Sequence, residues 1–163
     1  MSNSIVGSIL AGLVLLTGCQ SRPTANVQHT SLGIFEVVDC KTSGPAKAVS
    51  LKGSTEQYCL AAKPVVDQAD VRAAEAKRNP SGQPQLLLLF TIKTGNHMKE
   101  TTERILAEHQ KLGDQGKMAI VLDGTLISVL VLNGSVSDTL LLDGAFAWDD
   151  TVQIAEWLNT MPR

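Results

Sequence analysis

Residues 118–134 of this 163-residue chain read Met-Ala-Ile-Val-Leu-Asp-Gly-Thr-Leu-Ile-Ser-Val-Leu-Val-Leu-Asn-Gly. Two β-rich apolar runs lie on either side of Asp123-Gly124, and Asn133-Gly134 follows ten residues later. Such pairs are preferred in two-residue type I′ hairpin turns, because both central residues need positive φ. A third pair, Asp143-Gly144, is either another turn or the loop into a final helix. The stretch therefore predicts a β-meander with strands over Met118–Leu122, Leu126–Leu132 and Val136–Leu142.

The flanking sequence adds further strands and two helices, which gives an α+β class: one small domain, mainly an antiparallel sheet with two principal helices packed on it. The apolar run around Leu86–Phe90, bounded by turn signals, predicts a strand buried on both faces at the centre of the sheet. The secondary structure of residues 64–77 is left undecided, because the Ala-rich part favours a helix and the valines favour strands. The remaining expected elements are strands at Leu32–Val38 and Gln57–Ala61, a loop over 41–55, and helices over 95–112 and 148–159.

The N-terminus resembles the precursor of a bacterial lipoprotein. An apolar stretch of about a dozen residues, Ile5–Leu16, has the length of a signal-peptide core and is shorter than the roughly 20 residues that a membrane span needs. It ends in Leu16-Thr17-Gly18-Cys19, which is similar to a lipobox. The resemblance implies lipidation of Cys19 and anchorage of the mature chain to a membrane through that lipid.

One feature departs from the signal-peptide pattern, because the first four residues contain no Lys or Arg. A soluble secreted protein that is cleaved nearby, or an uncleaved anchor, are the alternatives. By analogy with Gram-negative lipoproteins, Gln20 favours the outer over the inner membrane on the periplasmic side. We thus expect a signal peptide over 1–18, a polar lipid-anchored tether over 19–30, and a folded domain over 31–163.

Composition narrows the classes of function. The formal net charge is −2 and only 4% of residues are aromatic, with no run of Lys or Arg, so a nucleic-acid partner is not expected. If Cys19 is lipidated, Cys40 and Cys59 remain as a pair, which an oxidising compartment would join in a disulfide; two buried thiols are the alternative. The histidines are not grouped with these cysteines at ligand spacing, so neither a metal site nor a cofactor is expected. They are His29, His97 and His109.

The C-terminal half resembles the head subdomain of the first periplasmic domain of SecD, a subunit of the protein-export machinery. The resemblance rests on the run Gly116–Gly124 followed by Leu126-Ile127-Ser128, and on a closing segment with Phe146 and Ile154-Ala155. Pro64–Ala74, and Gly82-Gln83-Pro84 before the Leu-rich strand, follow the order of the family. The similarity covers about residues 35–159.

The chain also departs from that family. Val129-Leu130 replaces the usual Ala-Pro after Ile-Ser, Ala147 precedes the last helix where Thr or Ser is common, and the transmembrane helices of SecD are lacking. The resemblance therefore implies the fold and a role in handling polypeptides, with no energised translocation step.

These observations favour a non-catalytic binding module that contacts exported polypeptides or an envelope partner. A sheet edge could accept an extended segment by strand addition, and residues 126–132 carry more apolar side chains than one buried face needs. A structural or self-associating lipoprotein is the alternative. The sequence identifies no catalytic residues and no small-molecule substrate, so an enzyme is not expected. Ser128 lies within a strand rather than on a nucleophile elbow, and the predicted turns account for Asp123 and Asp143.

Overall fold

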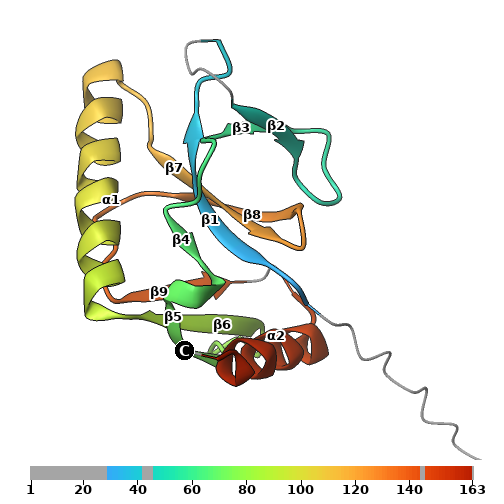
Figure 1. The fold of residues 1–163 in the computed structure, drawn as a ribbon. Helices are drawn as coiled ribbons and strands as arrows, with labels where there is room; N and C mark the ends of the chain where they lie inside the picture. Colours follow the sequence, from blue (N-terminus) through green and yellow to red (C-terminus); the bar gives the residue numbers. More distant parts are fainter. Residues whose placement is uncertain (1–28, 42–45, 144–145, 163) are drawn as a thin grey trace, which may run out of the picture.

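The computed structural model describes residues 29–41, 46–143 and 146–162. Two antiparallel sheets stack along the long axis of the molecule, helix α1 (Ile92–Leu112) runs along one side of both, and helix α2 (Trp148–Thr160) packs against the smaller, lower sheet (Figure 1). The α+β class with two principal helices, predicted from the sequence, is confirmed. In the described residues, no helix is both long and apolar enough to cross a membrane.

The larger sheet has the strand order β2-β3-β1-β7-β8, and the short β4 pairs with β1. An additional parallel bridge joins Leu51 to Leu126, so the sheet curls until its two edge strands touch at one point. The predicted loop over 41–55 is wrong in part, because β2 forms within it and pairs with β3 along four residues. The strands are β1 (Leu32–Val38), β2 (Lys47–Ser50), β3 (Gln57–Leu60), β4 (Val66–Asp67), β7 (Lys117–Leu122) and β8 (Thr125–Val131).

The smaller sheet has the order β5-β6-β9; it settles the open assignment of the Ala-rich segment and corrects the prediction of a strand buried on both faces. Its strands are β5 (Val71–Arg78), β6 (Pro84–Phe90) and β9 (Thr139–Asp143). The Ala-rich segment is a strand, and β6 lies at the centre of this smaller sheet. Buried and half-buried residues alternate along β6, so only one of its faces is fully buried.

The first hairpin of the predicted meander is confirmed, and the continuation of the meander is wrong. Asp123 (φ 50°) and Gly124 (φ 76°) form the positive-φ turn between β7 and β8. Gly134 has no positive φ, and β9 leaves the hairpin to pair with β6. The segment before β9 is held by the buried hydroxyl of Thr102, which accepts the Val136 N–H at 2.9 Å.

Capping residues explain where helix α1 begins and ends. Helix α1 (Ile92–Leu112) starts three residues earlier than predicted, because the Thr91 hydroxyl accepts the N–H of Thr94 at its N-terminus. It ends at Gly113, in the left-handed conformation that favours glycine. Helix α2 (Trp148–Thr160) begins after Ala147, which makes no side-chain cap.

Two apolar clusters hold the fold together. The main cluster joins α1, α2, the smaller sheet and one face of the larger sheet, with Ile34, Leu86, Met98 and Ile154 almost fully buried. A second, smaller cluster fills the curl of the larger sheet. It consists of Leu60, Ala119 and Leu126 with half-buried neighbours from β1, β2, β3, β7 and β8.

Candidate functional site

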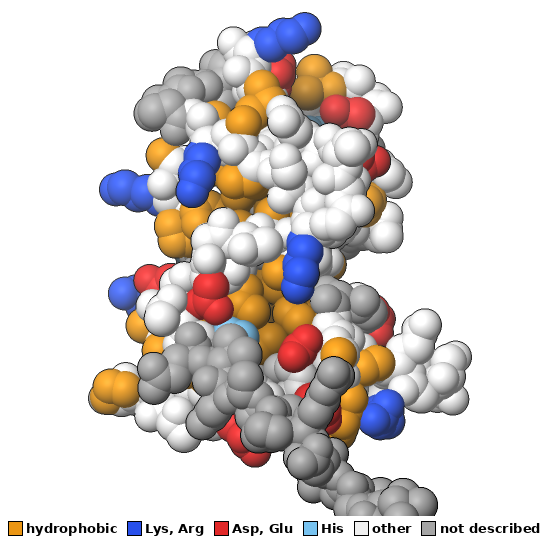
Figure 2. All heavy atoms as spheres, turned by 90° about the vertical axis from the view of Figure 1, so that its right-hand side faces the viewer, with side chains coloured by type: hydrophobic (Ala, Val, Ile, Leu, Met, Phe, Trp, Pro, Cys, Tyr) orange, Lys and Arg blue, Asp and Glu red, His pale blue; other side chains and the backbone are white. Residues whose placement is uncertain are grey.

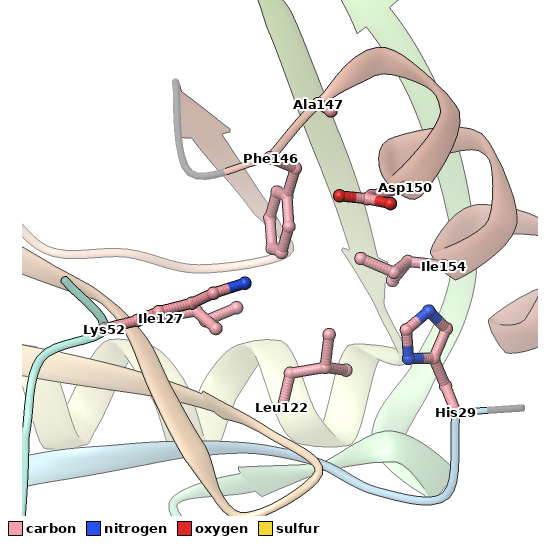
Figure 3. Close-up of a pocket in the computed structure, with 8 residues that line it drawn as sticks. All are labelled: His29, Lys52, Leu122, Ile127, Phe146, Ala147, Asp150 and Ile154. Carbon is pink, nitrogen blue, oxygen red and sulfur yellow. The ribbon is translucent and has the colours of Figure 1, made fainter. Parts of the chain in front are cut away.

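A hollowed band of apolar side chains crosses one face of the molecule between the two sheets (Figure 2). Two hollows share Ile127, and we call them together the β8 groove. The first hollow, of about 340 Å³, lies between the tip of the β7–β8 hairpin and the N-terminal part of α2 (Figure 3). It is lined by His29, Lys52, Leu122, Ile127, Phe146, Ala147, Asp150 and Ile154.

Three polar side chains reach into the first hollow from different elements. Lys52 comes from the turn after β2, Asp150 from the first turn of α2, and His29 from the segment before β1 (Figure 3). The other walls are aliphatic or aromatic. A mainly apolar hollow with a few convergent polar groups is the usual form of a binding site.

The second hollow, of about 320 Å³, follows β8 away from the hairpin tip. Lys117 lies 5.9 Å from the centre of the Tyr58 ring at one end of this hollow, and Asp143 of β9 lines it as well. Val131, a large apolar residue that lines this hollow, is 42% exposed. The lining residues are Leu51, Tyr58, Lys117, Ile127, Ser128, Val129, Val131 and Asp143.

The outer edge of β8 has unpaired backbone groups. Leu132 donates its N–H to the Gly116 carbonyl at 2.9 Å, and the pairing with β7 continues residue by residue as far as Ile120 and Ser128, where a bulge precedes the turn. Because hydrogen-bonded and non-hydrogen-bonded positions alternate in an antiparallel pair, the backbone groups of Val129 and Val131 point away from β7. Within the described residues, β8 is the last strand of its sheet and has no other partner beyond the bridge at Leu126.

The turn residue Asp123 fixes the start of the folded chain beside the groove. Its carboxylate accepts the N–H groups of Thr30 and Ser31 at 2.7 and 3.0 Å, and Nδ1 of His29 lies 2.8 Å from it. Partial burial raises the pKa of Asp123, but the hydrogen bonds from His29, Thr30 and Ser31 outweigh burial and lower the pKa to about 2. The His29 ring also lies against Trp157 of α2, with 5.7 Å between ring centres. His29 and Thr30, which the sequence places in the tether, thus make defined contacts with the domain.

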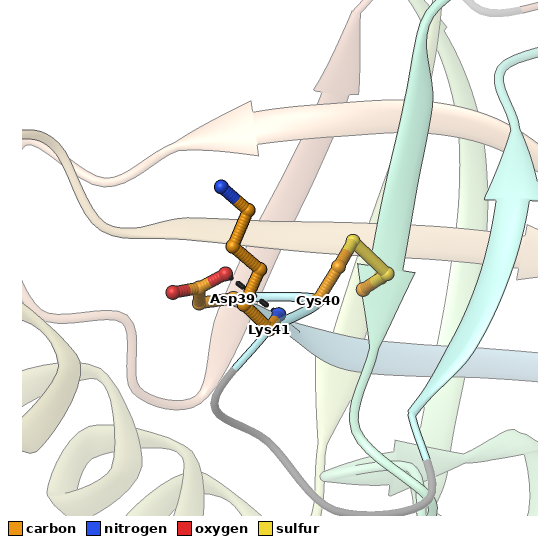
Figure 4. Close-up of a disulfide and its surroundings, with 4 residues drawn as sticks. Asp39, Cys40 and Lys41 are labelled. Atoms are coloured by element: carbon orange, nitrogen blue, oxygen red, sulfur yellow. Dashed lines mark hydrogen bonds between the residues drawn. A yellow bond between two sulfur atoms is a disulfide. The ribbon is translucent and has the colours of Figure 1, made fainter.

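The cysteines expected to pair are joined in the structure. A disulfide links Cys40 to Cys59, with 5.3 Å between their Cα atoms, at the end of β1 (Figure 4). Beside it, the N–H of Lys41 bonds to the carboxylate of Asp39 at 2.9 Å. Cys19 and the segment expected to be the signal peptide lie outside the described residues.

The other residues considered in the sequence are dispersed over the fold. Ser128 lines the second hollow, and Asp123 anchors the N-terminal segment in addition to forming a turn. His109 lies in the last turn of α1, 2.6 Å from a carboxylate oxygen of Asp114. His97 is exposed on α1. No group of three or more His, Cys, Asp or Glu side chains lies at metal-binding distances in the part of the chain described.

Comparison with known protein families identifies the fold. The model of the family described as SecDF, P1 head subdomain, matches residues 46–160, which include most of the strands and both helices. The chain belongs to the SecDF P1 head family. No curated protein matches it in sequence.

Two solved structures resemble this P1 head domain. One belongs to SecDF, described as a membrane component that enhances protein export; it has a TM-score of 0.60 and 18% identity over 81% of this chain. The other is a SecDF in the "Super-membrane-facing form", with a TM-score of 0.58 and 18% identity over 79% of this chain. The matches span 63% and 18% of those two chains. At this identity the likeness establishes the P1 head fold alone.

The groove brings together residues that the sequence did not place in a common site. Lys52 comes from the loop after β2, whereas Phe146 and Ile154 belong to the C-terminal segment with α2, and only the packing of the two sheets and α2 makes them neighbours. The one local signal was the excess of apolar residues in 126–132, which form β8 and line both hollows.

Proposed function

We propose that this protein is a lipid-anchored, periplasmic, non-catalytic module that binds segments of exported or envelope polypeptides in the β8 groove. The observation that carries the proposal is the combination of an apolar groove with a strand edge whose backbone groups are unpaired. Apolar side chains and an extended backbone are what an unfolded polypeptide presents. Membership of the P1 head family relates the domain to the protein-export machinery and supports this class of ligand.

The start of the folded domain supports the anchored arrangement. His29 lines the first hollow, so the segment that leads to Cys19 begins at the groove. Ten residues separate Cys19 from His29, and a chain of this length reaches at most about 35 Å. A lipid on Cys19 would keep the groove within this distance of the membrane surface on its periplasmic side. In Gram-negative lipoproteins an Asp after the lipidated cysteine tends to retain the protein at the inner membrane, so by this analogy Gln20 favours the outer membrane.

A photocrosslinking experiment tests the proposed function. A benzophenone amino acid is placed at Lys52, which is exposed and lines the groove, and as a matched control at Lys99 on the exposed side of α1. We expect adducts with pulse-labelled exported polypeptides from Lys52 and none from Lys99. Adducts between two copies of this chain would instead support the structural, self-associating lipoprotein, and equal labelling from both positions would contradict a specific groove.

Lipidation is tested separately by Cys19→Ala. We expect the variant to leave the membrane fraction and to lose the mobility shift given by the lipid. A variant that remains membrane-bound with unchanged mobility would contradict the anchor and leave the groove assignment intact.

A further inference from the structure

We propose that the β8 groove binds its ligand by strand addition and selects segments in which apolar and polar residues alternate. The inference rests on the proposed function and makes it specific. The bound segment extends the larger sheet along Ile127–Val131, because the carbonyl of Leu126 already accepts the N–H of Lys52. The end of the segment beside Ile127, which lines both hollows, places one apolar side chain in the hollow beside Lys52. The preferred ligands are then unfolded strand segments of exported polypeptides, rather than continuous apolar stretches such as membrane-spanning helices.

The unpaired backbone supplies the first part of the recognition. Val129 and Val131 line the second hollow and direct their N–H and C=O groups away from β7, in the alternating pattern that an extended backbone complements. Water satisfies these groups in the free protein, so their net contribution on binding is modest for each hydrogen bond. They nevertheless require an extended ligand, because a helical segment has no free backbone groups to offer.

The walls of the groove favour a single extended segment over the sheet edge of a second folded copy. In the first hollow, Lys52 lies on one side and Phe146 with α2 on the other. In the second hollow, beside Val129 and Val131, Leu51 and Tyr58 form one wall and Asp143 of β9 lies at another. An edge strand of another folded domain brings its neighbouring strands and helices with it, and these would meet both walls. An isolated segment has no such neighbours and fits between them.

The first hollow sets the side-chain preference. Its apolar lining by Leu122, Ile127, Phe146 and Ile154 suits one aromatic or branched aliphatic side chain, while Lys52 and Asp150 at its sides carry opposite charges. Successive side chains of a strand point to opposite faces, so every second residue of a bound segment faces the groove and the others face water. Because one positive and one negative side chain line the hollow, it does not favour ligands with several charged residues of the same sign.

Selective methylation of the ligand's backbone separates strand addition from apolar adsorption. The probe is a fluorescein-labelled peptide of about seven residues, the length of β8, in which phenylalanine and valine alternate with threonine. Two derivatives carry N-methyl groups on one or the other alternate set of amides, so that each loses the donors of one edge. Fluorescence anisotropy with the purified full chain measures the affinities.

We expect one methylated derivative to bind about tenfold more weakly than the parent, or worse, and the other to bind like the parent, since only one edge of the ligand faces β8. A peptide of the same composition with its apolar residues in one block should bind several-fold more weakly. Equal affinities of both methylated derivatives and the parent would overturn strand addition. If the parent failed to bind while Lys52 still crosslinked exported polypeptides, this inference would be wrong and the proposed function would stand.

A substitution in the protein provides the reciprocal test. Val129→Pro removes one outward N–H, and proline is tolerated on a strand edge whose N–H faces away from its partner. We expect the variant to keep a cooperative urea unfolding transition and to bind the parent peptide more weakly. The midpoint of that transition should fall somewhat, because the Val129 side chain packs against the second apolar cluster. An unchanged affinity in the folded variant would contradict pairing at this position. Should Val129→Pro fail to fold, the pair of methylated peptides decides the question with the unaltered chain.

Discussion

Replacement of Asp123 by Asn tests how the start of the folded chain is held beside the groove. Asparagine keeps the acceptor oxygen and tolerates the positive φ of the turn, so Asp123→Asn removes mainly the charge. Lowering the pKa from 3.8 to about 2 corresponds to roughly 2.4 kcal/mol, at about 1.36 kcal/mol for each tenfold change in acidity. Because the side chain is 32% exposed, solvent screening reduces the expected loss of stability to about 1–1.5 kcal/mol at pH 7.

The lowered pKa of Asp123 determines how the free energy of unfolding changes with pH. The carboxylate is more acidic in the folded chain than in the unfolded chain, so its contribution is complete above about pH 4 and disappears as the pH falls through about 2. Urea unfolding of the wild type and of Asp123→Asn should therefore differ at pH 7 and converge near pH 2. Asp39→Asn, another exposed carboxylate that accepts a backbone N–H, serves as the control. A difference that stays the same at both pH values would refute the assigned role of the charge.

Further predictions concern the interior and the disulfide. Thr102→Val leaves the N–H of Val136 without its acceptor inside the protein and should lower the free energy of unfolding by about 1–3 kcal/mol. The equally buried Thr151 only donates to a helix carbonyl, so Thr151→Val should cost less than about 1 kcal/mol, and equal losses in thermal unfolding would contradict this account. Reduction of the Cys40–Cys59 disulfide, whose cysteines are 19 residues apart, should lower the free energy of unfolding by about 3 kcal/mol. Urea curves with and without reductant measure the effect, and coincident curves would exclude it.

Local signals in the sequence predict the elements whose structure is decided locally. The Asp123-Gly124 pair predicts the β7–β8 hairpin because both residues adopt the positive φ that this turn requires. The helical periodicity predicts α1 and α2, because an α-helix forms its backbone hydrogen bonds between residues that are near one another in the sequence.

Long-range pairing explains what the sequence did not predict. In β9, Leu140 and Leu142 pair with Leu88 and Leu86 of β6, about fifty residues earlier in the chain, and this pairing outcompetes a third strand beside β8. The Ala-rich part of β5 has helix propensity, but pairing with β6 holds it as a strand, and Asn159 of α2 bonds to the N–H and the carbonyl of Ala74. The groove depends on the same rearrangement, because β8 has a free edge only when β9 joins the other sheet.

Residue-resolved amide exchange by NMR tests the central claim most directly. In the free protein, the amides of Val129 and Val131 should exchange rapidly, whereas the Val136 amide, held by the Thr102 hydroxyl, should be protected. Saturation with the alternating peptide should slow exchange at Val129 and Val131 and leave Val136 unchanged. If the peptide binds and both edge amides still exchange at the rate of the free protein, the ligand does not pair with β8 and the account is contradicted.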